Sequence, residues 1–387
     1  MMTNCRLAVA MSLVALVGLV ATPAGAAGMQ PHKAVYALSL GSSKTSSGVL
    51  GADGAMLYEW GETCTGWTTE QDFRLRLEYA DQDATTITSD LVTWESRDGS
   101  RYRFNERRLR NGHLDQVIRG KAHLDIPKSY VVGFDGGSAR LTDVGRDIVT
   151  RAAAAVARNP AYRVLVIAGA ATSGVRAVKA ENERLARRRT ELVREALLQD
   201  GVAPMVVQIA PGGTSPAATL AAQETSGPPP VHPVEIYLEP TRRGGVAEFS
   251  KPEQTTIPLA PRVLFPTAHT LFLINEAEAK VPFVVRHVFD GTTVDAATMI
   301  SAVIGPKLKP GVEGPGEHPI KSPLLDRPSW RMRLAFFPAD SKSEVPDYEL
   351  SMRLMDNGVS QDMVLDYGDY VIKATLQRIK ALSKPAC

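Results

Sequence analysis

The stretch Phe73-Arg-Leu-Arg-Leu-Glu-Tyr79 places an apolar side chain at each odd position and a charged one at each even position. This alternation is typical of a β-strand with one buried face and one wet face. It returns in Trp330-Arg-Met-Arg-Leu-Ala-Phe336 and in Tyr348-Glu-Leu-Ser-Met-Arg-Leu354. The last stretch runs into Asn357-Gly358, which is a strong hairpin signal. Many antiparallel strands joined by such turns predict a barrel, a spiral or a sandwich.

The segment from about Ile126 to Pro240 breaks this pattern, because strands and helices alternate along it. Thr142 stands where a helix N-cap is expected, and Asn159-Pro160 ends that helix because a residue before proline avoids the helical region. The order predicts an α/β sandwich inserted into a loop of the β domain. The expected elements are strand 129–134, helix 142–159, strand 162–167, helix 176–199, strand 206–209 and strand 234–238.

Length and composition fit a globular chain of more than one domain. The 387 residues favour two or three domains, and a net charge of +2 argues neither for nor against a nucleic-acid partner. The Arg-rich run 184–189 is interleaved with Glu181, Glu183 and Glu191, which stand at helical spacing for ion pairs. A secreted protein with such a helix is not expected to bind nucleic acid.

The first residues carry the pattern of a secretion signal. Arg6 supplies the positive charge, and Leu7 to Val20 form an apolar stretch too short to span a membrane. Ala24-Gly25-Ala26 fits a cleavage site, so we expect 1–27 to be a removed signal peptide. Cys5 leaves with it, and the mature protein is expected in the periplasm.

Two cysteines, Cys64 and Cys387, then remain. In an oxidising compartment such a pair suggests one disulfide, and two unrelated thiols are the alternative. On the chain-entropy model, closing so long a loop contributes roughly 4–5 kcal/mol to stability.

The outer segments, about 29–124 and 244–387, resemble the EipB family of α-proteobacterial envelope-integrity proteins. The resemblance implies a spiral, incomplete antiparallel β-barrel, similar in shape to periplasmic lipoprotein carriers. It also implies the Cys64–Cys387 disulfide and a role in envelope integrity without known catalysis. The matching stretches are Ala34 to Leu40, Met56 to Trp60, Cys64 to Trp67, Thr93 to Ser96, Leu264 to Thr270, Val288 to Gly291, Pro328 to Trp330 and Asp366 to Asp369.

The inner segment, about 126–240, resembles the OmpA C-terminal-like domain, which binds peptidoglycan. The resemblance implies that Arg189 would hold the free carboxylate of the peptide, since a guanidinium matches a carboxylate. Asn182 lies on the same helix face. The matching positions are Phe134, Leu141-Thr142, Gly145, Asn159-Pro160, Val164 to Gly169, Asn182, Leu185, Arg189, Val193, Leu197, Gly201-Val202 and Val234 to Ile236.

The chain departs from this family at one charged position. Thr172 stands where the family has the aspartate that pairs with the ligand's ammonium, and loss of such a partner costs about 2–5 kcal/mol. Two alternatives follow. The segment either retains peptidoglycan binding through Arg189, Asn182 and Thr172, or keeps the fold and contacts proteins. Because Arg189 lies among apolar residues, it needs a partner, such as Glu181 or a ligand.

Other candidate residues favour structural roles. Trp60, Trp67, Trp94 and Trp330 are expected in the core, with a ligand-lined barrel mouth as the alternative. His269, after a Pro-Thr turn, and His287 lack metal-ligand spacing. The sequence therefore predicts no metal, cofactor or catalytic site.

The sequence supports three hypotheses of function. The first is a non-enzymatic periplasmic protein of envelope integrity, with 28–124 plus 244–387 as a β-spiral and 126–240 as an insert that contacts peptidoglycan or envelope proteins. The second is a carrier that holds a lipid or lipoprotein acyl chain. The third is an envelope-acting enzyme, for which no convergent site is evident.

Overall fold

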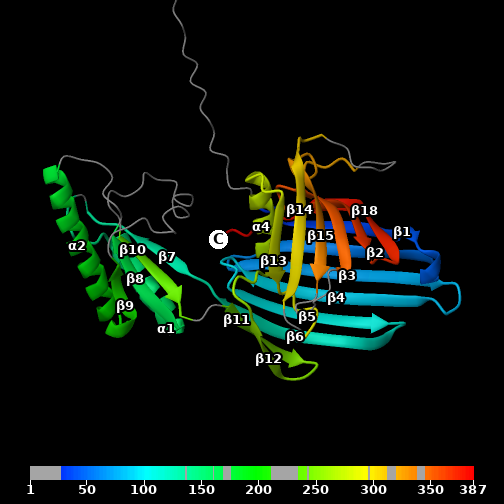
Figure 1. The fold of residues 1–387 in the computed structure, drawn as a ribbon, viewed down its shortest axis with the longest axis horizontal. Coiled ribbons are helices and arrows are strands. Elements are labelled where there is room, and N and C mark those ends of the chain that lie inside the picture. Colours follow the sequence, from blue (N-terminus) through cyan, green and yellow to red (C-terminus); the bar gives the residue numbers. More distant parts are fainter. Residues whose placement is uncertain are drawn as a thin grey trace, which may run out of the picture.

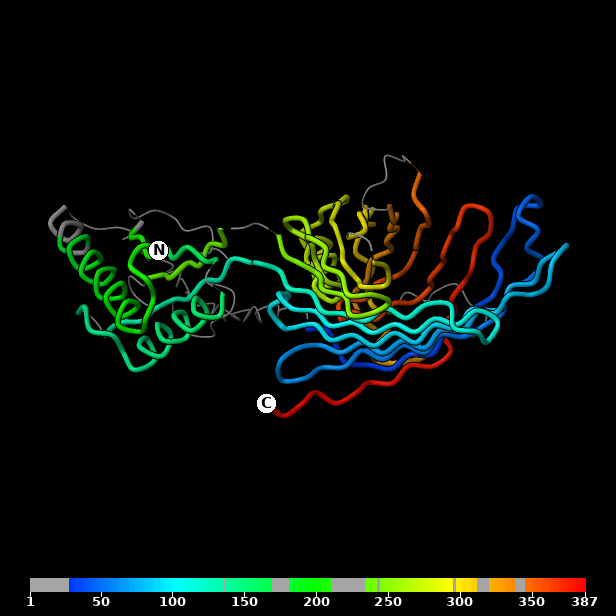
Figure 2. Tube along the Cα trace, turned by 90° about the horizontal axis from the view of Figure 1, so that it is seen from below, coloured from blue at the N-terminus to red at the C-terminus, as the bar shows by residue number. Residues whose placement is uncertain are grey.

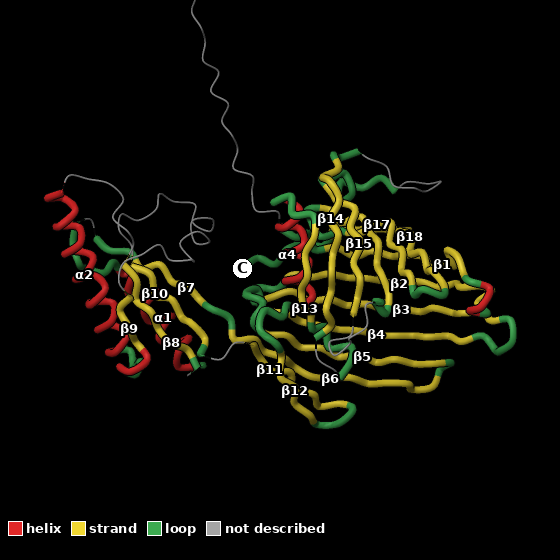
Figure 3. Tube along the Cα trace, in the orientation of Figure 1, coloured by secondary structure: helices red, strands yellow, loops and turns green. Residues whose placement is uncertain are grey.

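The computed structural model describes residues 28–135, 137–159, 161–168, 176–210, 234–241, 244–294, 297–311, 320–337 and 345–387. The signal-peptide prediction for 1–27 lies outside these residues. Within them the chain is mainly β, with one large antiparallel sheet and one smaller sheet that carries helices (Figures 1 and 3). The expected fold class is confirmed.

Fourteen strands of the described chain form the large sheet, in the order β12-β11-β6-β5-β4-β3-β2-β1-β18-β17-β16-β15-β14-β13. The order ends at β12 and β13, so the barrel is incomplete. The first half of the sheet is β1 (His32–Ser43), β2 (Val49–Glu62), β3 (Gly66–Tyr79), β4 (Thr85–Ser96), β5 (Arg101–Arg110), β6 (His113–Asp125), β11 (Gly244–Lys251) and β12 (Thr255–Leu259). The second half is β13 (Phe283–Val288), β14 (Thr298–Leu308), β15 (Ser329–Phe337), β16 (Tyr348–Met355), β17 (Ser360–Asp366) and β18 (Tyr370–Ala381).

Short turns set the meander of this sheet. Asn111 and Gly112 join β5 to β6 with φ of 52° and 80°, the left-handed backbone that tight hairpins require. Gly358, at φ 84°, follows Asn357 between β16 and β17, and Met355 N donates to Val359 O. The predicted hairpin at Asn357-Gly358 is confirmed.

The sheet coils back on itself, so that β13 to β16 (yellow to orange) lie over β1 to β6 (blue to cyan) in Figure 2. Alternate side chains of both halves form the core between the layers. One cluster is aromatic, with Phe104 at its centre, and the rings of Phe249 and Phe289 lie 5.4 and 5.5 Å from the Phe104 ring. Such pairs stabilise beyond their buried area.

Helix α4 (Pro266–Glu278) is an element of the outer segments that the sequence analysis did not foresee. It lies against β13 and β14 at one end of the sheet (Figure 1). Its residues Leu273, Ile274 and Ala277 are buried in a cluster with Trp330 and other side chains of β14 to β16. The expectation that the outer segments are all β is therefore wrong at this helix.

The smaller sheet falls between β6 and β11 along the chain, in the order β7-β10-β8-β9. Strands β8 and β9 are parallel and the other pairs antiparallel. Thr142 caps the first helix as predicted, because its Oγ1 accepts from Gly145 N at 2.9 Å. The elements are β7 (Lys128–Val132), α1 (Asp143–Arg158), β8 (Tyr162–Ala168), α2 (Arg176–Gln199), β9 (Val207–Ala210) and β10 (Val234–Pro240).

This smaller unit leaves the large sheet from two neighbouring strands. Asp125 at the end of β6 pairs with Gly244 at the start of β11. Two hydrogen bonds hold the root, from Asn159 Nδ2 to Asp125 Oδ1 and from Tyr162 OH to Ile126 O, both 2.8 Å. The smaller unit therefore replaces the turn that would otherwise join the adjacent strands β6 and β11.

Candidate functional site

Arg189 on α2 is one of the few buried charged residues of the smaller unit, with 2% of its surface exposed. Its neighbours Arg187 and Arg188 are both exposed. Val193, Ala196 and the residues of the adjoining core continue the buried side of α2. Arg189 thus lies where α2 packs inward.

The Arg189 guanidinium lies under the loop between β7 and α1. Its Nε donates to Ser138 O at 2.8 Å, a terminal nitrogen donates to Asp135 O at 3.4 Å, and the guanidinium carbon lies 4.8 Å from the Phe134 ring centroid. A bridge between Phe134 and Leu141 closes the loop, so its carbonyls are held in place. Main-chain carbonyls are thus two of the acceptors of this cation.

Burial lowers the pKa of Arg189 from its ordinary value. An arginine remains charged even so, because its pKa starts above 12. The expected candidate partner Glu181 forms an ion pair with Arg184 at 2.9 Å. A positive charge is therefore fixed beneath the β7–α1 loop.

The remaining predicted members of this site cannot be placed. Thr172 lies outside the described residues, and the structure describes the backbone of Asn182 in α2 but not its side chain. Their proposed roles rest on the sequence.

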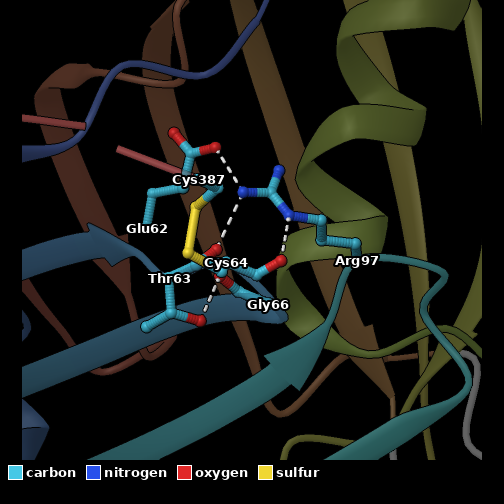
Figure 4. Close-up of a disulfide and its surroundings, with 6 residues drawn as sticks. All are labelled: Glu62, Thr63, Cys64, Gly66, Arg97 and Cys387. Atoms are coloured by element: carbon cyan, nitrogen blue, oxygen red, sulfur yellow. Dashed lines mark hydrogen bonds and ion pairs between the residues drawn. A yellow bond between two sulfur atoms is a disulfide. The ribbon is translucent and has the colours of Figure 1, made fainter. Parts of the chain in front are cut away.

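The structure joins Cys64 to Cys387 by a disulfide, with their Cα atoms 5.6 Å apart (Figure 4). Cys64 lies in the turn between β2 and β3, and Cys387 ends the tail that follows β18. Leu382 N donates to Pro31 O at 2.8 Å, which fixes the tail beside the start of β1. The predicted pairing is confirmed.

Arg97 holds the turn that carries Cys64. It donates to Cys64 O at 3.2 Å, to Thr63 O at 2.8 Å and to the Glu62 carboxylate at 2.7 Å (Figure 4). Its guanidinium also lies 4.7 Å from the Trp67 ring centroid. No local sequence pattern marks Arg97, because these partners lie 30 to 35 residues away along the chain.

Glu95 on β4 is a second buried charge that the sequence analysis did not single out. Its two carboxylate oxygens accept from Thr267 N and Ala268 N, each at 2.8 Å, at the first turn of α4. The N-cap residue Phe265 has no side-chain acceptor, so Glu95 supplies the cap from another strand. Burial raises the pKa of Glu95 to about 7, against the lowering effect of the two amides.

The candidate histidines and tryptophans are either buried or half-buried. His269 lies within α4 rather than after a turn, and burial together with Arg286 lowers its pKa to about 4. Trp60 and Trp330 are core residues with 1% exposure. The half-buried Trp67 and Trp94 instead lie under Arg97 and Arg103.

Three features of the described part of the chain bear on the class of site. The described residues contain no group of three or more His, Cys, Asp or Glu side chains that could hold a metal ion. Their helices are too short or too polar to cross a membrane. A hollow of about 230 Å³ lies over β1 to β4, lined by Val35, Leu57, Asp72 and Arg74 among others, on the face opposite the core.

The comparisons with known proteins agree with this fold. A model of the EipB-like family matches residues 23–152 and 232–383, which is most of the chain. The chain belongs to the EipB-like family. A model of the OmpA family matches residues 133–226, which overlap the end of the first EipB-like stretch and stop before the second. The chain therefore combines EipB-like and OmpA-like sequence.

Two relatives extend over nearly the whole molecule. The cell envelope integrity protein EipB of Brucella abortus (strain 2308) is 20% identical over 362 residues, which cover 93% of this chain and 86% of that protein. The crystal structure of a β-barrel-like protein of a domain of unknown function, also from Brucella abortus, has a TM-score of 0.57 and 19% identity. That match covers 92% of this chain and 99% of the other.

Proposed function

We propose that this EipB-like protein is a non-enzymatic periplasmic component of envelope integrity, whose inserted domain, 126–240, binds peptidoglycan through Arg189. The buried guanidinium carries the proposal, because an OmpA-like segment holds it beneath a closed loop. A ligand carboxylate beside Arg189 would form a charge-assisted hydrogen bond, which is about twice as strong as a bond to a neutral carbonyl.

The large sheet has a supporting role in this proposal. The disulfide and the β1–β18 pairing tie both ends of the described chain into one sheet, from which the insert leaves at Asp125 and Gly244. We propose that the sheet contacts envelope proteins while the insert holds it at the wall.

Co-sedimentation of the mature protein with purified peptidoglycan sacculi tests the proposal. The wild type should sediment with sacculi, and Arg189→Ala should lose at least about 10-fold in affinity, because removing one partner of a buried charge pair costs about 2–5 kcal/mol. Arg188→Ala is the matched control, since it removes the same charge from an exposed neighbour on α2.

A second variant is needed because Arg189→Ala could lose binding simply by failing to fold. Thr172→Asp restores the acid expected to face the ligand's ammonium, so it should tighten sacculus binding by about 10-fold or more. No sedimentation of either the wild type or Thr172→Asp would reject the wall-binding role. Equal losses in Arg189→Ala and Arg188→Ala would reject the site.

The carrier alternative gains no support from the hollow over β1 to β4. It has about 230 Å³, whereas small-molecule sites usually enclose about 300–1,000 Å³. It also opens away from the apolar core.

A further inference from the structure

Strand β5 presents a row of arginines on the outer face of the large sheet. Arg101, Arg103 and Arg107 are exposed, while Tyr102 and Phe104 between them are 1% and 2% exposed. Because successive side chains of a strand point to opposite faces, the three arginines share one face, opposite the aromatic core.

The row continues on β6, which pairs with β5, and on β11, which pairs with β6. Lys121 of β6 pairs with Arg103, and Arg119 pairs with Asn105. Lys251 of β11 pairs in turn with Arg119. Paired cations on adjacent strands are therefore about 5 Å apart, and cations two residues apart on one strand are about 7 Å apart. Arg107, four residues beyond Arg103, lies about 13 Å farther along β5. We call this surface the basic face, and it consists of Arg101, Arg103, Arg107, Arg119, Lys121 and Lys251.

Few acids balance the basic face. Glu248 forms an ion pair with Lys121 at 3.0 Å, and Asp90 stands opposite Arg107 in the strand register. Among the described residues, the ion pairs within 4.0 Å include none made by Arg101, Arg103 or Arg107. These three guanidiniums therefore keep their charge available to an external anion.

The other half of the same outer face has a different composition. On β2 and β3, acids alternate with cations, as in the ion pairs of Arg76 with Asp53 and Glu78. Lys33 is likewise paired with Glu59. Since the whole chain carries a net charge of only +2, the basic face is a local concentration of charge and not a result of composition.

An aromatic ring and an exposed apolar residue accompany the cations. The Arg103 guanidinium carbon lies 5.1 Å from the ring centroid of Trp94, which is half-buried, and Val92 beside it is 48% exposed. Tryptophan is enriched where one end of a side chain meets an apolar phase and the other meets water. This combination is typical of contact with a membrane surface.

We propose that the basic face binds an anionic phospholipid surface. A sheet face with several neighbouring cations suits an array of mobile phosphates, which requires no concave site. The hollow over β1 to β4 lies beside the cations, not among them. Strands β5, β6 and β11 lie side by side in the lower part of the sheet in Figure 1, next to the edge strand β12 and adjacent to the root of the insert. The proposal is independent of the peptidoglycan site, whose arginine lies on α2.

Vesicle co-sedimentation of the full mature chain tests the proposal. Vesicles of phosphatidylcholine alone are compared with vesicles that also contain phosphatidylglycerol, at about 0.1 M salt, where the Debye length is about 10 Å. The wild type should favour the anionic vesicles. The triple variant Arg101→Gln, Arg103→Gln, Arg107→Gln should lose about 100-fold in partitioning, since each surface cation contributes about 5-fold.

A matched triple variant removes the same charge from the other half of the face. Lys33→Gln, Arg74→Gln, Arg76→Gln should change partitioning by less than about 3-fold, because these side chains lie among acids. Equal losses in the two triple variants would show a net-charge effect and overturn the proposal. So would equal binding of the wild type to neutral and anionic vesicles.

The vesicle test also separates the two proposals. Arg189→Ala should leave vesicle binding unchanged, because α2 takes no part in the basic face. If the basic face instead governs sedimentation with sacculi and vesicles are ignored, its occupant is the wall and the lipid proposal is wrong.

Discussion

At the scale of single residues, two buried charges are each held by main-chain groups of a distant segment. Glu95 accepts from two amides of α4, and Arg189 donates to two carbonyls of the β7–α1 loop. Amides and carbonyls at such positions would otherwise lack partners. Each charge therefore fixes a local backbone segment while it loses its own hydration.

The pKa of Glu95 predicts a pH-dependent stability. Its folded value of about 7 lies above its ordinary value of 4.5, so the folded state favours the protonated acid. The contribution of protonated Glu95 to the free energy of unfolding is therefore complete below about pH 4.5, and it is lost as the pH rises through 7. The loss amounts to at most about 3 kcal/mol, from 1.36 kcal/mol per unit.

Urea unfolding of the wild type and of Glu95→Gln between pH 5 and 8 measures this contribution. The glutamine side chain does not titrate, and its single carbonyl oxygen can still accept from one of the two amides of the helix. The difference in unfolding free energy between the two proteins should shrink as the pH rises. A difference that stays constant over this range would show that Glu95 does not titrate there.

At the scale of elements, glycines make room for the aromatic cluster. A Cβ at Gly120 of β6 would lie 2.5 Å from both Glu248 O and the Phe104 ring. Gly291, at φ 72°, approaches the same ring from the loop after β13, and its Cβ would lie 2.3 Å from it. The close packing of β5, β6 and β11 around the Phe104 ring thus requires glycine, which has no Cβ, at these two positions.

Gly120→Ala should therefore destabilise the protein by about 1–3 kcal/mol, the usual cost of overpacking a core. Gly41→Ala on β1 is the control, because its nearest contacts, at 3.2 Å, are side-chain atoms of Lys373 and Val371. Thermal unfolding of both variants checks the prediction. Equal melting of the two would mean that the Phe104 ring moves aside without cost.

At the scale of the whole molecule, strand β1 closes the chain on itself. It pairs with β2 on one side and with β18 on the other, which brings the two ends of the described sequence together. The disulfide then links residues separated by 323 positions, at the β2–β3 turn. The strand pairings stabilise the folded state, whereas the disulfide acts mainly by limiting the freedom of the unfolded chain.

Cys64→Ser should lower the unfolding free energy by about 4 kcal/mol under oxidising conditions and leave it unchanged under reducing conditions. Cys387→Ser should have the same effect, and the double variant should be no worse than either single one. Thermal or urea unfolding with and without a reductant measures this. If the oxidised wild type and Cys64→Ser unfold at the same temperature, the disulfide does not stabilise the fold.

The sequence by itself determined the strands, the turns and the two helices of the insert. Alternation such as that of 73–79, the Asn-Gly turns and the Thr142 cap are local signals, because each depends on residues a few positions apart. The pairing of Cys64 with Cys387 was also predictable, since only two cysteines remain once the signal is set aside.

Only the tertiary structure decided what depends on residues far apart in the chain. Helix α4 was missed because apolar residues surround it and its cap comes from Glu95, more than 170 positions away. The basic face was missed for the same reason, since β5 and β11 meet only through the register of β6. Local periodicity fixes which face of a strand is buried, but strand order decides which exposed charges become neighbours.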